Sequence, residues 1–149
     1  MIIKCTDFDR QALASIHFNP KDLEDDGTNY EGKQVEKPWG YETEIYRDEH
    51  ICGWLLHIRA GQQTSMHCHP NKTTMLIIRS GAAQVHSLMV THLLDIGDML
   101  FIEKGAFHRT EAIGGWDLLI YELETPPNKR DLVRLEDKYG RGQGYEHVA

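Results

Sequence analysis

The chain has 149 residues, of which 40% are hydrophobic, so it is long enough to bury the core of one ordinary domain. Its 23 acidic residues outnumber its 16 Lys and Arg residues, and the formal net charge of -7 argues against a nucleic-acid partner. No apolar run approaches the length of a membrane span, so we expect no membrane partner.

The cysteines point to a reducing compartment. There are three of them, an odd number, and none lies in the C-x-x-C spacing of a redox or zinc motif. The first ten residues, MIIKCTDFDR, carry acidic side chains and no long apolar core, so they do not resemble a signal peptide. We therefore expect the protein to be cytoplasmic.

Residues 1–36 are predicted to form an extension in front of the main domain. Residues 9–16 are expected to form a short helix, whereas residues 23–34, LEDDGTNYEGKQ, are polar and turn-rich, as in a surface loop. From residue 37 onward, short segments rich in β-branched, aromatic and aliphatic residues alternate with glycines. This spacing predicts an all-β sandwich or barrel. The expected strands lie at residues 41–47, 52–58, 73–79, 82–90, 98–103 and 116–124.

The main domain is predicted to span residues 37–141 and to be followed by a glycine-rich tail at residues 142–149. Within it, residues 131–137 are expected to form a short helix or turn. A segment this short is not stable alone, so its apolar side chains should pack against the barrel and close one side of it. These side chains are Leu132, Val133 and Leu135.

Three histidines are the candidate metal ligands. On an extended strand, residues two apart point to the same face, so His67 and His69 should project together while Cys68 faces away. A third histidine, His108, follows in a later strand segment. Three imidazoles on one face could hold a divalent transition metal.

Two spaced motifs around these histidines resemble those of the cupin superfamily. Gly61, His67, His69, residue 74 and Gly81 match every spacing of the first cupin motif. The second motif is matched by Gly97, Gly105 and His108, with Glu103 in place of its usual proline. The flanks most resemble the cupin domain of type II mannose-6-phosphate isomerases: KPWGYE at residues 37–42, RSG at 79–81 and DLVRLEDKYGR at 131–141.

The resemblance implies a double-stranded β-helix, the cupin jelly-roll barrel, with a metal inside it and a sugar-phosphate or nucleotide-sugar context. The chain departs from the family at residue 74, where the usual glutamate ligand is a threonine. His67, His69 and His108 would then be the whole protein ligand set. Such a site keeps open positions and suits Zn, Ni or Fe better than Mn.

We therefore expect a metal-dependent sugar-phosphate isomerase-like enzyme that interconverts an aldose and a ketose. The expected base is Glu103, with Glu111 as an alternative, because the reaction needs a group that moves a proton. Lys72, Arg109 and Arg59 are the expected substrate-binding residues, since cations hold phosphate by charge-assisted hydrogen bonds. The partners should be a small sugar or sugar phosphate and a second copy of the chain, as a homodimer.

Two alternatives remain open from the sequence. One is a non-catalytic sugar-binding module whose site lost its carboxylate at Thr74. The other is a three-histidine Fe(II) dioxygenase, because three neutral imidazoles leave three positions on the iron for substrate and oxygen.

Overall fold

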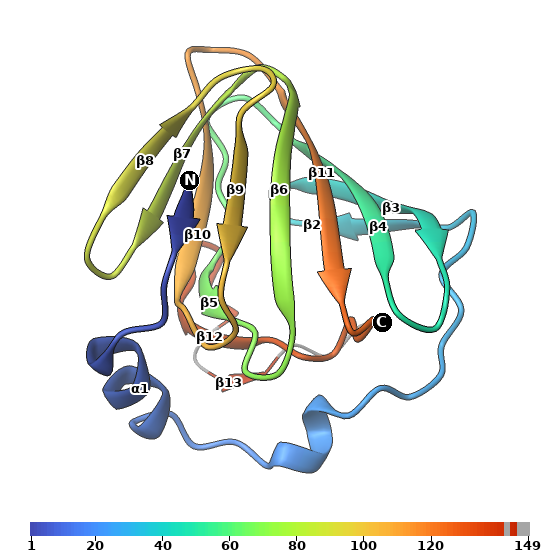
Figure 1. The fold of residues 1–149 in the computed structure, drawn as a ribbon. Helices are drawn as coiled ribbons and strands as arrows, with labels where there is room; N and C mark the ends of the chain where they lie inside the picture. The colour runs from blue at the N-terminus through green and yellow to red at the C-terminus, as the bar shows by residue number, and fades with distance from the viewer. Residues whose placement is uncertain (142–143, 146–149) are drawn as a thin grey trace.

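Two facing β-sheets form a barrel in the computed structural model, which describes residues 1–141 and 144–145 (Figure 1). In the seven-stranded sheet the order is β1 (Ile2–Ile3), β9 (Met99–Ile102), β6 (Thr73–Ser80), β11 (Leu118–Thr125), β4 (Cys52–Ile58), β3 (Gly40–Arg47) and β2 (Gln34–Lys37). In the six-stranded sheet it is β13 (Gly144–Tyr145), β12 (Val133–Glu136), β5 (Met66–Cys68), β10 (His108–Ile113), β7 (Ala82–Ser87) and β8 (Thr91–Leu94). The fold is the predicted all-β double-stranded β-helix.

Period-two alternation of apolar residues builds the barrel core. In β6, Thr74, Leu76 and Ile78 are buried, and the residues between them lie half-exposed on the outer face. The inward side chains of both sheets form one large cluster that includes Trp54, Leu100 and Ile120. The six predicted strands correspond to β3, β4, β6, β7, β9 and β11.

The N-terminal residues run along the outside of the barrel. β1 pairs in parallel with β9, so the chain begins as an edge strand of the larger sheet. Helix α1 (Asp7–Ala14) follows, and its Thr6 cap and Asp9 form a reciprocal capping box. The 3-10 helix η1 (Pro20–Leu23) then leads across one end of the barrel toward β2 (Figure 1). The predicted helix at residues 9–16 thus exists and begins two residues earlier.

The segment at residues 131–137 corrects our expectation of a short helix or turn. It contains the strand β12, which pairs antiparallel with β5 and places Val133 opposite Cys68 and Arg134 opposite His67. Val133 and Leu135 are two residues apart and join a second apolar cluster with residues of α1, whereas Arg134 faces the barrel interior. The segment forms a strand because the edge of β5 offers backbone partners and because the apolar residues that it adds to this cluster, Val133 and Leu135, are spaced two apart, as on a strand.

The tail expected at residues 142–149 lies mostly outside the described residues; its described part is β13, which pairs with β12. In the described chain, no helix is long and apolar enough to cross a membrane.

Candidate metal centre

His67, His69 and His108 converge inside the barrel. His67 and His108 are cross-strand partners on β5 and β10, and His69 lies two residues beyond His67. The ring centroids are 4.6–5.3 Å apart, and one nitrogen from each ring lies within 4.8 Å of the other two. The structure therefore brings together the three histidines that the sequence singled out.

Backbone carbonyls orient all three imidazole rings. Nδ1 of His67 lies 2.9 Å from the oxygen of Ser65, that of His69 is 2.7 Å from the oxygen of Asp131, and that of His108 is 2.9 Å from the oxygen of Ala106. A carbonyl oxygen only accepts, so each Nδ1 carries the hydrogen and each Nε2 keeps its lone pair. This is the outer-shell arrangement by which metal-binding histidines are held in place.

The electrostatics of the three rings also favour a metal. Burial lowers the pKa of His67 and of His69 well below the usual histidine value, and it lowers the pKa of His108 to about 4. All three are therefore neutral at pH 7, the form that donates to a metal. Among the described residues, the buried Nε2 of His69 has no hydrogen-bond partner. The donor set fits a divalent transition metal.

Thr74 lies inside the barrel but supplies no carboxylate. It is 2% exposed, and its hydroxyl oxygen has no hydrogen-bond partner in the described part of the chain. On the neighbouring strand β11 its partner is Glu124, whose carboxylate also lies inside the barrel. Glu124 is not part of the three-histidine group, so that group offers nitrogen donors alone.

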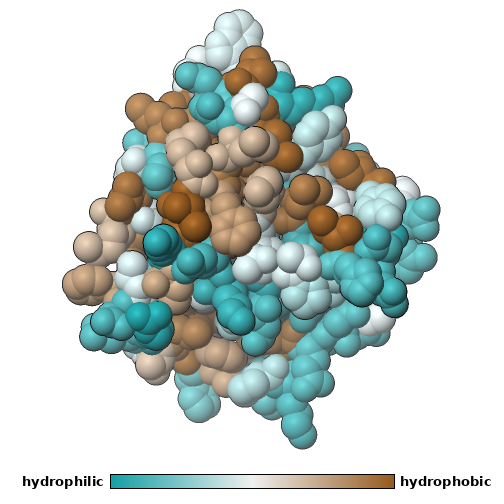
Figure 2. All heavy atoms as spheres, viewed as in Figure 1, coloured by the Kyte–Doolittle hydropathy of each residue, from teal (hydrophilic) through white to brown (hydrophobic). Residues whose placement is uncertain are grey.

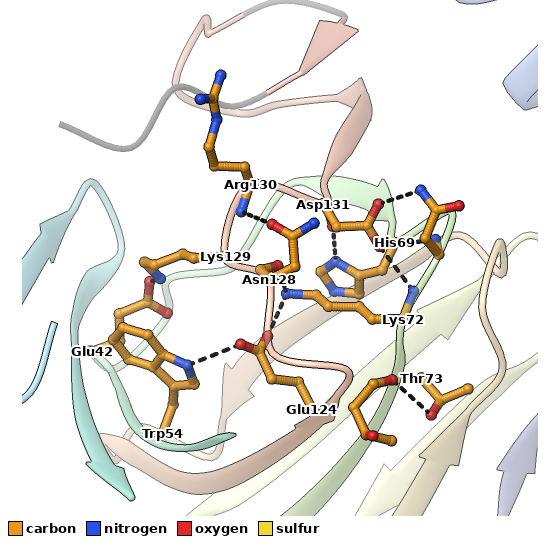
Figure 3. A network of polar contacts seen from close by, with 12 residues as sticks. Glu42, Trp54, His69, Lys72, Thr73, Glu124, Asn128, Lys129, Arg130 and Asp131 are labelled. Carbon is orange, nitrogen blue, oxygen red and sulfur yellow. Dashed lines mark hydrogen bonds and ion pairs between the residues drawn. The ribbon is translucent and has the colours of Figure 1, made fainter. Parts of the chain in front are cut away.

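A buried ion pair adjoins the histidines (Figure 3). The Lys72 ammonium donates to the Glu124 carboxylate and to the backbone oxygen of Asn128 at 2.8 Å. The side chains of Lys72 and Glu124 are only 4% and 2% exposed. Although burial disfavours the ammonium, the Glu124 carboxylate raises the pKa of Lys72. A fixed positive charge therefore lies beside the imidazoles, whose protonated forms it further disfavours.

Asp131 anchors the segment that closes the site. Its fully buried carboxylate accepts hydrogen bonds from the backbone N–H of Asn71 and of Lys72, at 2.8 and 2.9 Å. Its backbone oxygen is the acceptor for His69 described above. One residue thus fixes both the loop before β6 and the orientation of a candidate ligand (Figure 3).

The histidines line a cavity with about 60 Å³ of free space, enough for an ion and several water molecules. Five cationic side chains and three carboxylates share its lining, so its charged groups carry a surplus of positive charge. The cations are Lys37, Lys72, Lys129, Arg134 and Arg141, and the carboxylates are Glu42, Glu122 and Glu124.

An aromatic wall completes the cavity. Trp39 and Trp54 line it together with Leu56, and the Lys129 ammonium lies 4.0 Å from the Trp54 ring centroid while also pairing with Glu42. Aromatic faces flanked by charged groups suit a polar ligand that has an apolar face, such as a sugar ring.

Of the other residues expected at the site, only Lys72 lines this cavity. Glu103 uses its carboxylate to accept a 2.8 Å hydrogen bond from the backbone N–H of Cys5, so it holds the N-terminal segment. Arg59 is exposed, and Arg109 lines a separate surface depression with Gln63 and Lys138. The structure does not bring these three to the histidines.

The sequence reasoning missed two acidic residues of the cavity. Glu122 and Glu124 lie two residues apart in an otherwise apolar strand, so both point inward from β11. That spacing within YELE was a readable signal. Asp131 was less accessible to sequence reasoning, because its role depends on a contact across 62 residues.

A family model described as mannose-6-phosphate isomerase C-terminal matches residues 24–137. The chain belongs to this family. Among its curated relatives, mannose-1-phosphate guanylyltransferase ManC of Salmonella typhimurium is 26% identical over 137 residues, which cover 89% of this chain and 28% of ManC. The chain therefore spans about a quarter of the length of the curated relatives that it matches.

Solved structures show the fold of this family member. The capsular polysaccharide assembling protein CapF of Staphylococcus aureus superposes with a TM-score of 0.63 at 18% identity, over 74% of this chain and 33% of CapF. A sugar phosphate isomerase from a cupin superfamily, SPO2919 of Silicibacter pomeroyi, gives a TM-score of 0.54 at 13% identity, over 58% of this chain and 59% of that one. The barrel is thus a cupin double-stranded β-helix.

Proposed function

We propose that this cupin is a metal-dependent sugar-phosphate isomerase that interconverts an aldose and a ketose form of a hexose phosphate. The observation that carries the proposal is the convergence of three buried, neutral imidazoles in a cavity with surplus positive charge. His67, His69 and His108 would hold the metal, for which Zn, Ni and Fe are the candidates. A metal held there would supply Lewis-acid polarisation of the substrate carbonyl.

The cavity's own charges support an anionic sugar as the substrate. The cationic side chains that line it can hold a phosphate by charge-assisted hydrogen bonds. Lys72 is already paired with Glu124, so we assign it to the positive potential beside the metal position. Arg134 and Arg141, from the C-terminal block of the sequence resemblance, line the same cavity, and their planar guanidinium groups match the geometry of a phosphate. Arg141 also pairs with Asp137 at 2.7 Å, so its position at the cavity is fixed. The family's name and the ManC likeness are consistent with a mannose phosphate.

The proposal is tested with purified protein loaded with each candidate metal and supplied with mannose 6-phosphate. Conversion to the ketose is followed by NMR. We expect His69→Ala to lose both metal and turnover, while His50→Ala, at an exposed histidine outside the cavity, keeps both. Equal rates in wild type and His69→Ala, or no turnover with any of the metals, would refute the isomerase.

The donor set also supports a second candidate, an Fe(II) dioxygenase. Its three nitrogens, without a carboxylate in the group, leave positions open for substrate and oxygen. Consumption of oxygen by the iron-loaded protein in the presence of a sugar, without isomerisation, would favour this candidate.

We further propose that the protein acts as a cytoplasmic homodimer. Figure 2 shows apolar side chains gathered over the face formed by β9, β6 and β11. Met75, Ile77 and Met99 point outward on neighbouring strands of this face, and Met99 is 54% exposed. A contiguous apolar sheet face is suited to burial against a second copy.

A further inference from the structure

Strand β11 carries two carboxylates into the barrel. Glu122 and Glu124 alternate with outward residues, and Glu122 lies opposite Trp54 on β4 and Leu76 on β6. Both acids line the cavity that contains His67, His69 and His108. The barrel therefore holds carboxylates beside the candidate metal centre even though Thr74 provides none.

The three carboxylates of the cavity differ in what they contact. Glu42 pairs with Lys129 and lies 3.8 Å from the ammonium of Lys37. Glu124 pairs with Lys72 and accepts a 3.4 Å hydrogen bond from the indole of Trp54. Glu122 makes no hydrogen bond or ion pair with any residue that the structure describes. Glu42 and Glu124 are therefore held in ion pairs, whereas among the described residues the Glu122 carboxylate has no such partner and can face a ligand in the cavity.

We propose that Glu122 is the proton-transferring group of this cavity and, resting on the proposed isomerase function, the catalytic base. Its carboxylate takes the proton from C2 of the aldose, the electrons of that C–H bond form a double bond between C1 and C2, and the π electrons of the C1–O1 carbonyl move onto O1. The hydroxyl proton then moves from O2 to O1. Glu122 returns its proton to C1 through the electrons of the C1–C2 double bond, while an electron pair on O2 forms the carbonyl of the ketone at C2. No oxidant or further reactant is needed, and Glu122 ends in its starting state.

The charges around Glu122 suit this role. Burial raises the pKa of Glu122 to about 7, the Lys72 ammonium opposes that rise, and the Glu124 carboxylate reinforces it. Lys37 acts in the same direction as Lys72, and the three histidines are neutral. A base whose pKa is near the working pH combines the correct protonation state with useful basicity.

The first test counts protons and needs no substrate. Zn²⁺ is titrated into the metal-free protein at pH 7 in buffers of different ionisation enthalpy. The neutral histidines release no proton, whereas a partly protonated Glu122 in the same cavity should release a fraction of a proton per metal. We expect Glu122→Gln to release measurably fewer protons than wild type, and Glu36→Gln, at an exposed acid on β2, to match wild type.

Glu122→Asp is the control for a folding defect. It keeps a carboxylate at this position, so it should still release protons when the metal binds. Equal proton counts for wild type and Glu122→Gln, each binding one metal, would overturn the proposal.

The second test follows turnover and exchange of the C2 hydrogen of mannose 6-phosphate with D2O. Glu122→Gln should lose both by about 100-fold or more while it keeps its metal. Glu103→Gln tests the base that the sequence suggested: loss of turnover there, with full turnover in Glu122→Gln, would overturn the assignment. If wild type never isomerises the sugar but shows the proton difference, the proposed function fails and Glu122 remains the titrating group of the cavity.

Discussion

Replacing Lys72 by methionine should destabilise the protein severely. The side chains of Lys72 and Glu124 are 4% and 2% exposed, so the substitution strands a carboxylate in the barrel with only the 3.4 Å hydrogen bond from Trp54. Removing one partner of a buried ion pair costs about 3–5 kcal/mol, since the remaining charge is desolvated without compensation. For a chain of this length, that loss lowers the melting temperature by about 10 °C.

The measurement is urea unfolding of the metal-free proteins at pH 7, supported by thermal melts. The double variant Lys72→Met/Glu124→Gln should recover most of the lost stability, because it removes both charges. Arg10→Met breaks an exposed surface pair with Asp7 and should leave the midpoint of unfolding unchanged. A loss below about 1 kcal/mol in Lys72→Met, as for exposed ion pairs, would refute the reasoning.

The remaining predictions concern acid stability, metal preference, loop anchoring and assembly. Burial lowers the pKa of His108 to about 4, so at pH 4.5 the unfolded chain binds a proton at this residue and the folded chain mostly does not. Between pH 7 and pH 4.5 the free energy of unfolding of the metal-free wild type, measured in urea, should therefore fall by about 2 kcal/mol more than that of His108→Gln. Thr74→Glu should tighten Mn²⁺ binding in calorimetry by adding an oxygen donor; unchanged affinity would mean that residue 74 does not face the metal. Asp131→Ala should weaken metal binding about 10-fold or more in the same assay, because it frees the segment that orients His69, whereas exposed Asp95→Ala should not. Sedimentation at micromolar concentration should show a dimer that Met99→Glu dissociates, and a monomeric wild type would contradict it.

The fold could be predicted because its signals are local. Strands such as β6 and β11 alternate buried and outward residues, and glycines separate them. Gly81 shows why the motif spacing is informative: its φ is +85°, and a Cβ there would lie 2.5 Å from the backbone oxygen of Asp117. The turn therefore requires glycine, and the sequence records that requirement.

What the sequence could not provide depends on contacts between distant segments. The period of two in β12 was too short to outweigh a helical interpretation, and the unpaired edge of β5 that selects the strand lies 65 residues earlier. The position of Glu103 also depends on a distant segment, because its carboxylate accepts a hydrogen bond from the backbone N–H of Cys5. The YELE spacing could have indicated that Glu122 points inward, but its lack of an ion pair with any described residue becomes visible only in the structure.

The carbonyl that orients His69 belongs to Asp131, which follows it by 62 residues. During synthesis, both spaced histidine motifs are made before that carbonyl, so a chain that ends before Asp131 has the candidate ligands without the group that orients one of them. Metal uptake is therefore expected to come late and to depend on β12 having joined β5. A bound ion would then mark a chain completed through residue 136, and a chain cut short before Asp131 would lose its metal even though every ligand is present.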